Sequence, residues 1–428
     1  MSAAQPSAAT RPRVVVVGGG FAGLSAVRAL SGADADVLLL DRDLYTTFQP
    51  LLYQVAAGTL NAGDITYALR SFAGRFRNVR FRRACVTGLD PANRRVRLDD
   101  GAEVGYDYLI LACGVTANFF GIPGAAEHAR TTYTRAAAIE VRDRVLGNLE
   151  AYAQGREGAV EPVAVIVGGG PTGVEMAGAL AELCNAGLAY AYPEIDPERV
   201  RVVLIEMLDS VLAPFDPKLR EYAADALRER GVDLRLGVAV KEVCPDWVVL
   251  ADGERLPSAA TIWATGVKVD DEVSRWGLPQ GRGGRIRIGP DLRVDGRPEI
   301  FAVGDVAADR DKALPQLARP AIDGGRHAGA QVRHLLVGEP TEAFVYRDRG
   351  ISATIGRSDA VIQLPFGVKL RGLVAWLGWV GLHVVLLMGG RNRLATMVNL
   401  AARYLTWRRA PNLIVGDPAL TSSGSRPG

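Results

Sequence analysis

The chain has 428 residues, which is enough for two or three domains with their own hydrophobic cores. Hydrophobic residues make up 48% and charged residues 23%, a balance typical of globular proteins and not of disordered ones. The 50 Lys and Arg residues nearly cancel the 47 Asp and Glu residues, so the overall charge gives no reason to expect nucleic-acid binding. The opening residues, MSAAQPSAATRPR, lack an apolar run of the secretory type, so we expect a short disordered tail and no secretory signal.

The first predicted element is a buried parallel strand at Val14–Val17. It ends in a GxGxxG spacing, at Gly18, Gly20 and Gly23, and a helical pattern follows. A second strand, DVLLLDRD, reaches an acid at Asp41. A dinucleotide needs this layout: a tight turn, a close approach of the backbone to the pyrophosphate, close helix–strand packing, and an acid for the ribose hydroxyls. The glycines alone would also fit a turn without a ligand, but strand, helix and acid together favour a nucleotide.

The same unit returns 150 residues later, where the strand PVAVIV leads into Gly168, Gly170 and Gly173 and a later strand ends at Glu206. Two further landmarks recur at an offset of 152: an Asp-Gly turn at 99–101 and 251–253, and an Ala-x-Gly-Val segment at 112–115 and 264–267. Each turn predicts a hairpin, and each segment ends a buried strand near the ligand. The sequence therefore predicts an α/β protein with two homologous Rossmann-like dinucleotide-binding domains.

Two such domains can hold two dinucleotides and let one reduce the other. The acid at the end of each second strand favours a free 2′-hydroxyl, and no arginine follows Glu206 directly to receive a 2′-phosphate, so NADH is expected over NADPH. A flavin is the natural second cofactor, because it accepts the hydride that nicotinamide delivers.

The four cysteines, Cys85, Cys113, Cys184 and Cys244, are too scattered for a CxxC pair. We therefore expect no metal site and no redox dithiol, and the cysteine usage fits a reducing compartment. The four histidines show no ligand-like grouping either.

With these motifs in place, the chain resembles the two-dinucleotide-binding flavoproteins and, within them, the type II NADH:quinone oxidoreductases, from about residue 13 to the C-terminus. The broader marks are the two glycine motifs, TIWATGV at 261–267 and IFAVGD at 300–305. The narrower marks are FQPLLYQ at 48–54, GPTGVE at 170–175 and the C-terminal segments GISATIGR and WLGWVGLHVVLLMGGRNRL.

The resemblance implies that the first motif binds FAD and the second NADH, and that the loop at 50–54 lies near the flavin ring. Asp305 would contact the ribityl chain. Glu175 would lie beside the nicotinamide and the flavin and couple NADH binding to quinone reduction; the alternative is an ordinary first-turn helix acid favoured by the helix dipole.

The residues expected to bind each cofactor follow from the motifs and the resemblance together. For FAD they are Gly18, Gly20, Phe21, Ala22, Gly23, Asp41, Arg42, Pro50, Leu51, Val86, Ala112, Gly114, Gly304, Asp305 and Ala318. For NADH they are Gly168, Gly170, Pro171, Thr172, Gly173, Glu175, Glu206, Thr265 and Gly266.

The quinone site departs from the family pattern, in which two glutamines line the quinone entrance. Arg319 and Asp323 stand at the matching positions, and Gln54 is the third residue expected to contact quinone. Arg319 and Asp323 either form a salt bridge that keeps the shape of the site, or bind a quinone carbonyl through the guanidinium, or indicate a different acceptor.

The C-terminal region contains a 19-residue run without formal charge at Gly372–Gly390, followed by a helical pattern at Leu394–Trp407 with several arginines. The run is at the lower limit for a membrane span, and the second segment is typical of a helix lying on anionic lipid. A buried core or dimer helix is the alternative. We expect attachment to the cytoplasmic face of the cell membrane, with lipid and quinone as partners. The sequence leaves open whether the C-terminal run spans the membrane or lies on it, and whether the protein forms a homodimer.

These predictions combine into a domain scheme. It places an FAD domain at 13–122 and 289–329, an NADH domain at 160–288 and a membrane-associated region at 331–409. The function expected is oxidation of NADH with two-electron transfer to a membrane quinone, without proton pumping. The rivals are a reductase of an iron–sulfur protein, a sulfide:quinone oxidoreductase, which needs reactive cysteines near the flavin, and a redox-responsive flavoprotein without enzymatic activity.

Overall fold

The structure is a computed structural model and describes residues 11–309 and 314–406. The chain forms two compact units. The first unit comprises residues 1–47, 67–116 and 267–347, and the second comprises 48–66, 117–266 and 348–428. Four short strands lie where the chain passes from one unit to the other: β3 (Tyr45–Thr47), β4 (Thr66–Ala68), β10 (Thr116–Ala117) and β19 (Val267–Lys268).

The first unit is built on an eight-stranded sheet in the order β23-β20-β21-β22-β9-β1-β2-β5. The strands β22, β9, β1, β2 and β5 are parallel neighbours, and the valines of β1 at its centre are fully buried. The strands of this sheet are β1 (Arg13–Val17), β2 (Asp36–Asp41), β5 (Val79–Arg83), β9 (Tyr108–Leu111), β20 (Ile286–Ile288), β21 (Arg293–Val294), β22 (Arg297–Ala302) and β23 (Ala307–Asp309).

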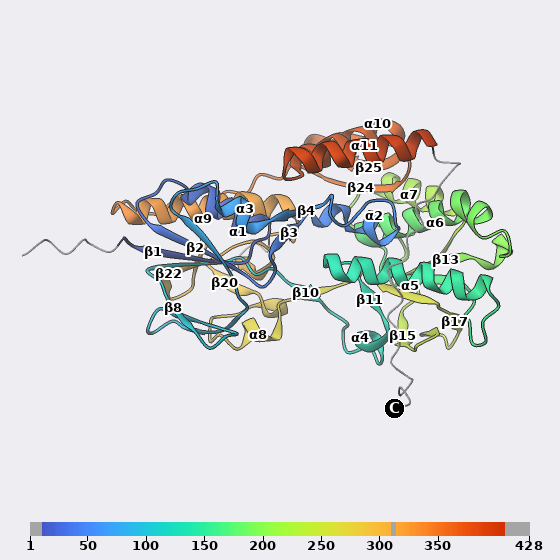
Figure 1. Cartoon of the computed structure of the whole chain (residues 1–428), viewed down its shortest axis with the longest axis horizontal. Helices are drawn as coiled ribbons and strands as arrows, with labels where there is room; N and C mark the ends of the chain where they lie inside the picture. The colour runs from blue at the N-terminus through green and yellow to red at the C-terminus, as the bar shows by residue number, and fades with distance from the viewer. Residues whose placement is uncertain (1–10, 310–313, 407–428) are drawn as a thin grey trace, which may run out of the picture. The chain divides into compact units, whose positions relative to one another are not determined.

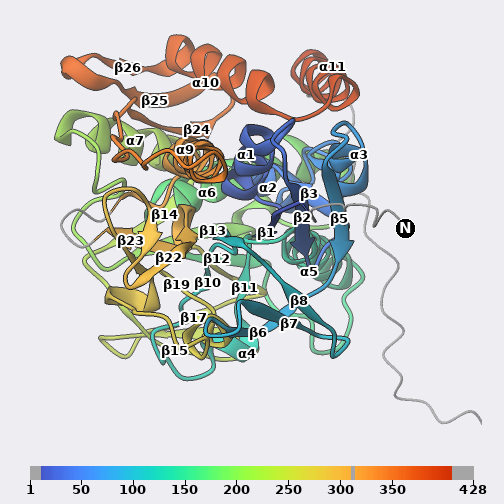
Figure 2. The same cartoon turned by 90° about the vertical axis from the view of Figure 1, so that its left-hand side faces the viewer.

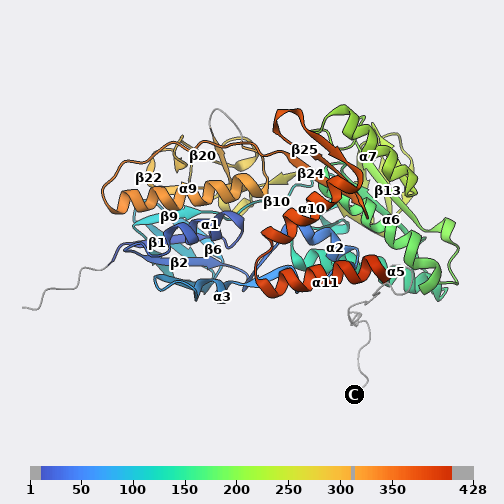
Figure 3. The same ribbon diagram turned by 90° about the horizontal axis from the view of Figure 1, so that it is seen from above.

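Two long helices of the first unit, α1 (Phe21–Leu30) and α9 (Ala318–Leu336), run side by side over the sheet (Figures 1 and 3). An antiparallel sheet of β6 (Val86–Asp90), β7 (Arg95–Leu98) and β8 (Glu103–Gly105) contains the first predicted hairpin. The remaining helices are short: α3 (Leu69–Ala73) and α8 (Asp271–Ser274).

The second unit repeats this plan with a five-stranded parallel sheet in the order β11-β18-β12-β13-β14. Its strands are β11 (Arg130–Thr131), β12 (Val163–Val167), β13 (Arg201–Glu206), β14 (Val232–Leu236) and β18 (Ala260–Trp263), and its antiparallel companion contains β15 (Val240–Val243), β16 (Trp247–Leu250) and β17 (Arg255–Pro257). Its helices are α2 (Leu52–Ala56), α4 (Ala125–His128), α5 (Arg135–Ala153), α6 (Pro171–Ala191) and α7 (Pro217–Glu229).

The C-terminal part of the second unit is a β-sheet covered by helices. The strands β24 (Ile351–Gly356), β25 (Asp359–Gln363) and β26 (Lys369–Arg371) form an antiparallel sheet, and α10 (Gly372–Leu386) packs on β25 (Figure 2). A further helix, α11, spans Gly390–Thr406, so the last residue of the helix predicted from Leu394 onward, Trp407, lies outside the described residues. Among the described residues, no helix has the length and apolar character needed to cross a membrane.

The predicted α/β architecture and its duplicated Rossmann-like cores are present. The duplication is exact at the level of register: β1 pairs with β2 so that Val17 lies opposite Leu40, and β12 pairs with β13 so that Val167 lies opposite Ile205. The domain scheme, with FAD at 13–122 and 289–329, NADH at 160–288 and the membrane at 331–409, stays a prediction.

Candidate functional site

The first glycine turn has the geometry that a bound pyrophosphate requires. Gly18 has φ +105°, and a Cβ atom added to it would lie 2.3 Å from the carbonyl O of Ala112. A Cβ atom on Gly23 would lie 1.8 Å from the carbonyl O of Gly18, so this glycine lets α1 pack directly on the turn. At Gly20, by contrast, an added Cβ atom would meet nothing within 4 Å. The turn is therefore closed where the backbone must be tight and open at the start of α1, where a phosphate would approach.

Asp41 lies at the end of β2, as predicted, and its carboxylate closes the turn. It accepts hydrogen bonds from the backbone N–H groups of Gly19 at 2.5 Å and Asp43 at 2.7 Å. Burial raises the pKa of Asp41, and these two hydrogen bonds partly offset that shift. The carboxylate is thus held at the tip of the turn, within reach of the ribose of a nucleotide in this position.

The second glycine turn reproduces the first. Gly168 has φ +112°, a Cβ atom on Gly173 would lie 1.8 Å from the carbonyl O of Gly168, and one on Gly170 would meet nothing within 4 Å. Glu206 accepts hydrogen bonds from the backbone N–H groups of Gly169 at 2.6 Å and Leu208 at 2.9 Å. Both turns fit a dinucleotide on the same structural grounds.

The strand-end segment of the second unit is contacted by an aromatic residue, Phe120, that the sequence did not predict. Gly266 has φ +67°, and a Cβ atom on it would lie 2.2 Å from Cζ of Phe120. Phe120 has φ +53° and a side chain that is 59% exposed. Thr265 packs against Gly168 at the other side of this segment. The only signal for Phe120 was the pair of aromatic residues before Gly121, which carries no ligand information by itself.

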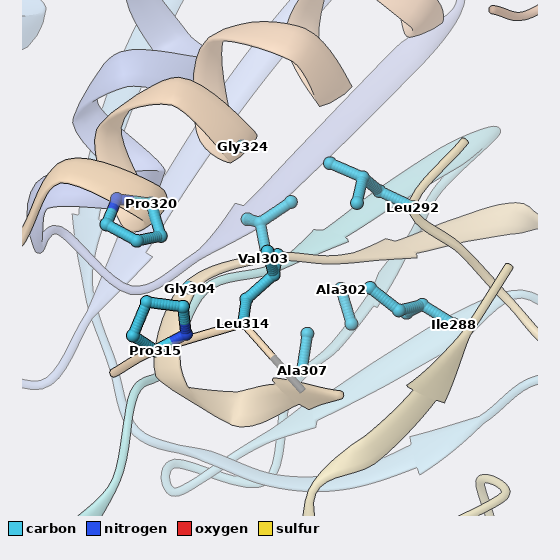
Figure 4. Close-up of a pocket in the computed structure, with 10 residues that line it drawn as sticks. All are labelled: Ile288, Leu292, Ala302, Val303, Gly304, Ala307, Leu314, Pro315, Pro320 and Gly324. Carbon is cyan, nitrogen blue, oxygen red and sulfur yellow. The ribbon is translucent and has the colours of Figure 1, made fainter. Parts of the chain in front are cut away.

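Gly304 and Asp305 lie where β22 leads into a 3₁₀ turn. Gly304 has φ +72°, and a Cβ atom on it would approach those of Ala22 and Ala321 to 3.2 and 3.4 Å. Burial raises the pKa of Asp305 to about 6, although the nearby Arg285 guanidinium lowers it. Figure 4 shows a small pocket beside Gly304, lined mainly by apolar side chains: Ile288, Leu292, Ala302, Val303, Ala307, Leu314, Pro315, Pro320 and Gly324.

Arg285 is a second residue that the sequence did not single out. Its Nη2 donates to the backbone carbonyl of Leu314 at 3.3 Å, and its Nε is buried without a hydrogen-bond partner among the described residues. A cation close to Asp305 favours the ionised form of that carboxyl group. In the sequence it was one of several arginines in a Gly-Arg-rich stretch.

Arg319 and Asp323 form the salt bridge that was one of the sequence alternatives. Arg319 Nε lies 2.9 Å from Asp323 Oδ2, one helical turn apart on α9. Asp323 also pairs with Arg326. The side chain of Arg319 is one-third exposed, whereas that of Asp323 is 16% exposed.

Glu175 lies in α6 and its carboxylate accepts a hydrogen bond from the backbone N–H of Thr354 at 3.3 Å. Burial raises the pKa of Glu175 to about 8, with only the Thr354 hydrogen bond acting in the other direction. The alternative of a first-turn helix acid is wrong: α6 begins at Pro171, and its first turn contains no acid. A carboxyl group that titrates near neutral pH is suited to proton transfer.

Gln54 is buried in α2, and its Nε2 donates to the Tyr53 hydroxyl at 2.9 Å. The other predicted residues lie at the ends of the expected elements: Phe21 and Ala22 begin α1, Pro171 and Thr172 begin α6, Ala318 begins α9, Val86 begins β6, and Arg42, Ala112 and Gly114 follow β2 and β9. The predicted FAD residues are divided between the units, because Pro50 and Leu51 belong to the second and the rest to the first. Similarly, Gln54 belongs to the second unit, and Arg319 and Asp323 to the first.

Comparison with known proteins now decides the family. Residues 12–325 match the pyridine nucleotide-disulphide oxidoreductase family. Two type II NADH:quinone oxidoreductases of Mycobacterium tuberculosis are similar over most of their length. One is 37% identical over 99% of this chain and 92% of its own, and the other is 34% identical over 96% and 91%. The chain belongs to the type II NADH:quinone oxidoreductases.

Solved structures agree with this family at the level of the fold. NDH2 of Plasmodium falciparum, in complex with NADH, superposes with a TM-score of 0.85 at 18% identity, covering 93% of this chain and 99% of that one. The sulfide:quinone oxidoreductase of Aquifex aeolicus superposes less well, with a TM-score of 0.73 at 20% identity, covering 92% and 94%. At 18% and 20% identity, these two structures show that the fold is shared.

Proposed function

We propose that this member of the family oxidises NADH with FAD as its cofactor and reduces a membrane quinone, without pumping ions. The observation that carries the proposal is the duplicated turn, closed at Gly18 and Gly168 and open at Gly20 and Gly170, in a chain that belongs to this family. When bound, the flavin takes a hydride from NADH and gives two electrons to the quinone.

The residues of the chain bind and orient the cofactors. The turn at Gly18–Gly23 with Asp41 would hold FAD, and Asp305 would accept a hydrogen bond from its ribityl chain. The turn at Gly168–Gly173 would hold NADH, and Glu206 would bind the adenosine ribose.

Glu175, Gln54 and the Arg319–Asp323 pair are the residues proposed for quinone. Quinone reduction consumes two protons. The carboxyl group of Glu175, which is protonated near neutral pH, is therefore suited to proton transfer. The Arg319 side chain, which is one-third exposed, can donate to a quinone carbonyl.

We further propose that α10 and α11 lie on the membrane surface. They carry large apolar side chains that are more than half exposed, while Ala375, Trp379, Thr396 and Leu400 are buried. Exposed apolar side chains of this size are stabilised by insertion into a lipid interface. The exposed set is Leu373, Val374, Leu377, Leu382, Val385, Leu394, Met397 and Val398.

The loop before β26 has exposed apolar side chains as well. Phe366, with φ +65°, is fully exposed, and Leu364 and Val368 beside it are 38% and 48% exposed. Large apolar patches of this kind on soluble proteins mark interaction surfaces. Attachment to the cytoplasmic face would place the dinucleotide sites in the compartment that contains NADH.

Anaerobic stopped-flow spectroscopy tests the reaction. The FAD-loaded protein is mixed with NADH and then with a quinone in detergent. Bleaching of the flavin by NADH and recovery on adding quinone is the expected result. Bleaching without recovery would contradict the quinone half of the proposal, and no bleaching would contradict the NADH half.

A further inference from the structure

A buried polar chain links three segments of the second unit that are far apart in sequence. The Tyr53 hydroxyl of α2 lies 2.9 Å from Thr354 Oγ1 of β24, and it accepts a hydrogen bond from Gln54 Nε2 at 2.9 Å. The backbone N–H of Thr354 in turn donates to Glu175 of α6. As whole residues, Tyr53, Gln54 and Thr354 are only 7%, 5% and 3% exposed.

The Tyr53 and Thr354 hydroxyl groups are hydrogen-bonded to each other, and either can be the donor. A phenol that accepts a hydrogen bond from an amide still has its own proton to donate, and Thr354 Oγ1 is within reach as an acceptor. Because a buried polar group without a partner is costly, each link holds the next in place. The Tyr53 hydroxyl is the central member of this chain.

The strand that carries Thr354 lies directly on the helix that carries Glu175. A Cβ atom added to Gly178 of α6 would lie 1.8 Å from the carbonyl O of Ile355, so helix and strand are in backbone contact one turn beyond Glu175. Because α6 and β24 are this close, a small shift of β24 moves the Thr354 N–H relative to the Glu175 carboxylate. The Glu175 contact, at 3.3 Å, is already near the limit of a hydrogen bond.

We propose that Tyr53 and Thr354 are positioning residues for Glu175: the Tyr53 hydroxyl anchors β24 through the Thr354 hydroxyl and so sets the distance from the Thr354 N–H to the Glu175 carboxylate. The inference rests on the proposed function only in the assumption that Glu175 acts in the reaction. The anchoring itself is a property of the folded second unit.

The network has one further titratable neighbour, His383 of α10. The Trp379 ring contacts both Tyr53 and His383. Burial lowers the pKa of His383 to about 4, so it is neutral at physiological pH. The contributions to the pKa of Glu175 are burial and the Thr354 N–H, with no charged neighbour among them. A change in this one hydrogen bond should therefore be visible in its titration.

The test is an infrared titration of the FAD-loaded enzyme, in which the carbonyl band of protonated Glu175 is assigned by its loss in Glu175→Gln. In Tyr53→Phe we expect the midpoint of this band to rise by about half to one pH unit, because a weaker hydrogen bond to the charged form disfavours ionisation. Thr354→Val, which keeps the shape of the side chain, should give the same rise, and Thr354→Ser should titrate like the wild type.

Tyr106→Phe is the matched control. Tyr106 is also buried, but its hydroxyl has no hydrogen-bond partner among the described residues. It belongs to the first unit, so its removal should leave the Glu175 midpoint unchanged. A purely structural role of Tyr53 would lower stability without moving the midpoint, and that result would overturn the proposal.

The two proposals fail in different ways. If Glu175→Gln leaves NADH:quinone turnover intact, the assigned role of Glu175 is wrong, while a midpoint shift in Tyr53→Phe would still support the anchoring. If Glu175→Gln abolishes turnover but neither Tyr53→Phe nor Thr354→Val moves the midpoint, the anchoring is wrong and the proposed function stands.

Discussion

At the scale of single residues, Glu175 is a carboxyl group placed where its ionised form is disfavoured. Burial raises its pKa from 4.5 to about 8, so the folded protein holds a proton that the unfolded chain releases. Between these two values the folded state binds more protons than the unfolded state. The contribution of Glu175 to stability is therefore present below pH 4.5 and is lost as pH rises through 8.

This titration predicts the stability of Glu175→Gln. Glutamine cannot ionise, so the variant should gain in Tm over the wild type, by a few degrees, as pH rises from 5 to 9. Thermal unfolding by circular dichroism at both pH values measures the difference. A difference that is the same at both values would mean that Glu175 titrates normally.

The two glycine turns allow the cofactor assignment to be tested residue by residue. In Gly173→Ala the new methyl group collides with the Gly168 carbonyl, so NADH affinity should fall at least about tenfold while FAD is retained. In Gly23→Ala the equivalent collision with Gly18 should weaken FAD binding by a similar factor. Flavin absorbance after gel filtration and NADH titration separate the two effects. Loss of FAD in Gly173→Ala would reverse the assignment.

The glycine spacing predicted these turns because each glycine is required by a contact within a few residues or by the next strand. Phe120 and Arg285 escaped prediction for the opposite reason. Each matters through one partner, Gly266 or Asp305, that the fold brings close from a distant part of the sequence.

At the scale of elements, the α1–α9 pair shows how small residues bring helices together. Cβ atoms added to Gly325 and Gly329 would lie 2.0 and 2.6 Å from the carbonyl O atoms of Ala22 and Ala26. The two helices therefore touch along their backbones. This contact positions the start of α1, where the first glycine turn ends.

Substitution of these glycines should separate the effect of helix–helix packing on stability from the effect of helix propensity. Gly325→Ala should destabilise the first unit by about 1–3 kcal/mol through overpacking. Gly324→Ala is the control, since its Cβ would meet only Leu292 at 3.7 Å and alanine favours the helix. Chemical denaturation followed by flavin release measures both. An equal change in stability in Gly325→Ala and Gly324→Ala would show that the backbones of α1 and α9 are farther apart at Gly325 than in the structure.

The hairpins show the same division between local and distant determinants. The Asp-Gly turns at 99–101 and 251–253 predicted β7–β8 and β16–β17, because turn chemistry is local. The C-terminal sheet β24–β25–β26 was not predicted as a sheet. Its placement against α6 depends on Gly178, which in sequence is one more small residue in an apolar helix.

At the scale of the whole molecule, the apolar surface of α10 and α11 predicts how the enzyme reaches its quinone. In Leu373→Glu with Leu377→Glu, binding to phospholipid vesicles should fall at least about tenfold, because inserting a carboxylate into the apolar part of the interface is costly. Reduction of the flavin by NADH should not change. Vesicle co-sedimentation measures binding, and unchanged sedimentation would refute the membrane face.

A matched control uses the buried side of the same helix. Trp379→Phe keeps an aromatic ring in the core and should leave vesicle binding intact, since Trp379 is 2% exposed. Loss of vesicle binding in Trp379→Phe as well would indicate that α10 has unfolded. The loss in the double glutamate variant would then not report on the exposed surface.

By itself, the sequence determined the duplicated α/β cores, the two glycine turns with their acids and the family, because each depends on periodicity or on contacts between residues close in the chain. Tertiary structure alone decided the contact of Phe120 with Gly266 and the placement of Glu175 against Thr354. It also decided that the apolar run at 372–390 divides into a helix ending at Leu386 and the start of another at Gly390. Hydrophobicity alone does not specify which face of a helix is buried; that depends on the strands against which it packs.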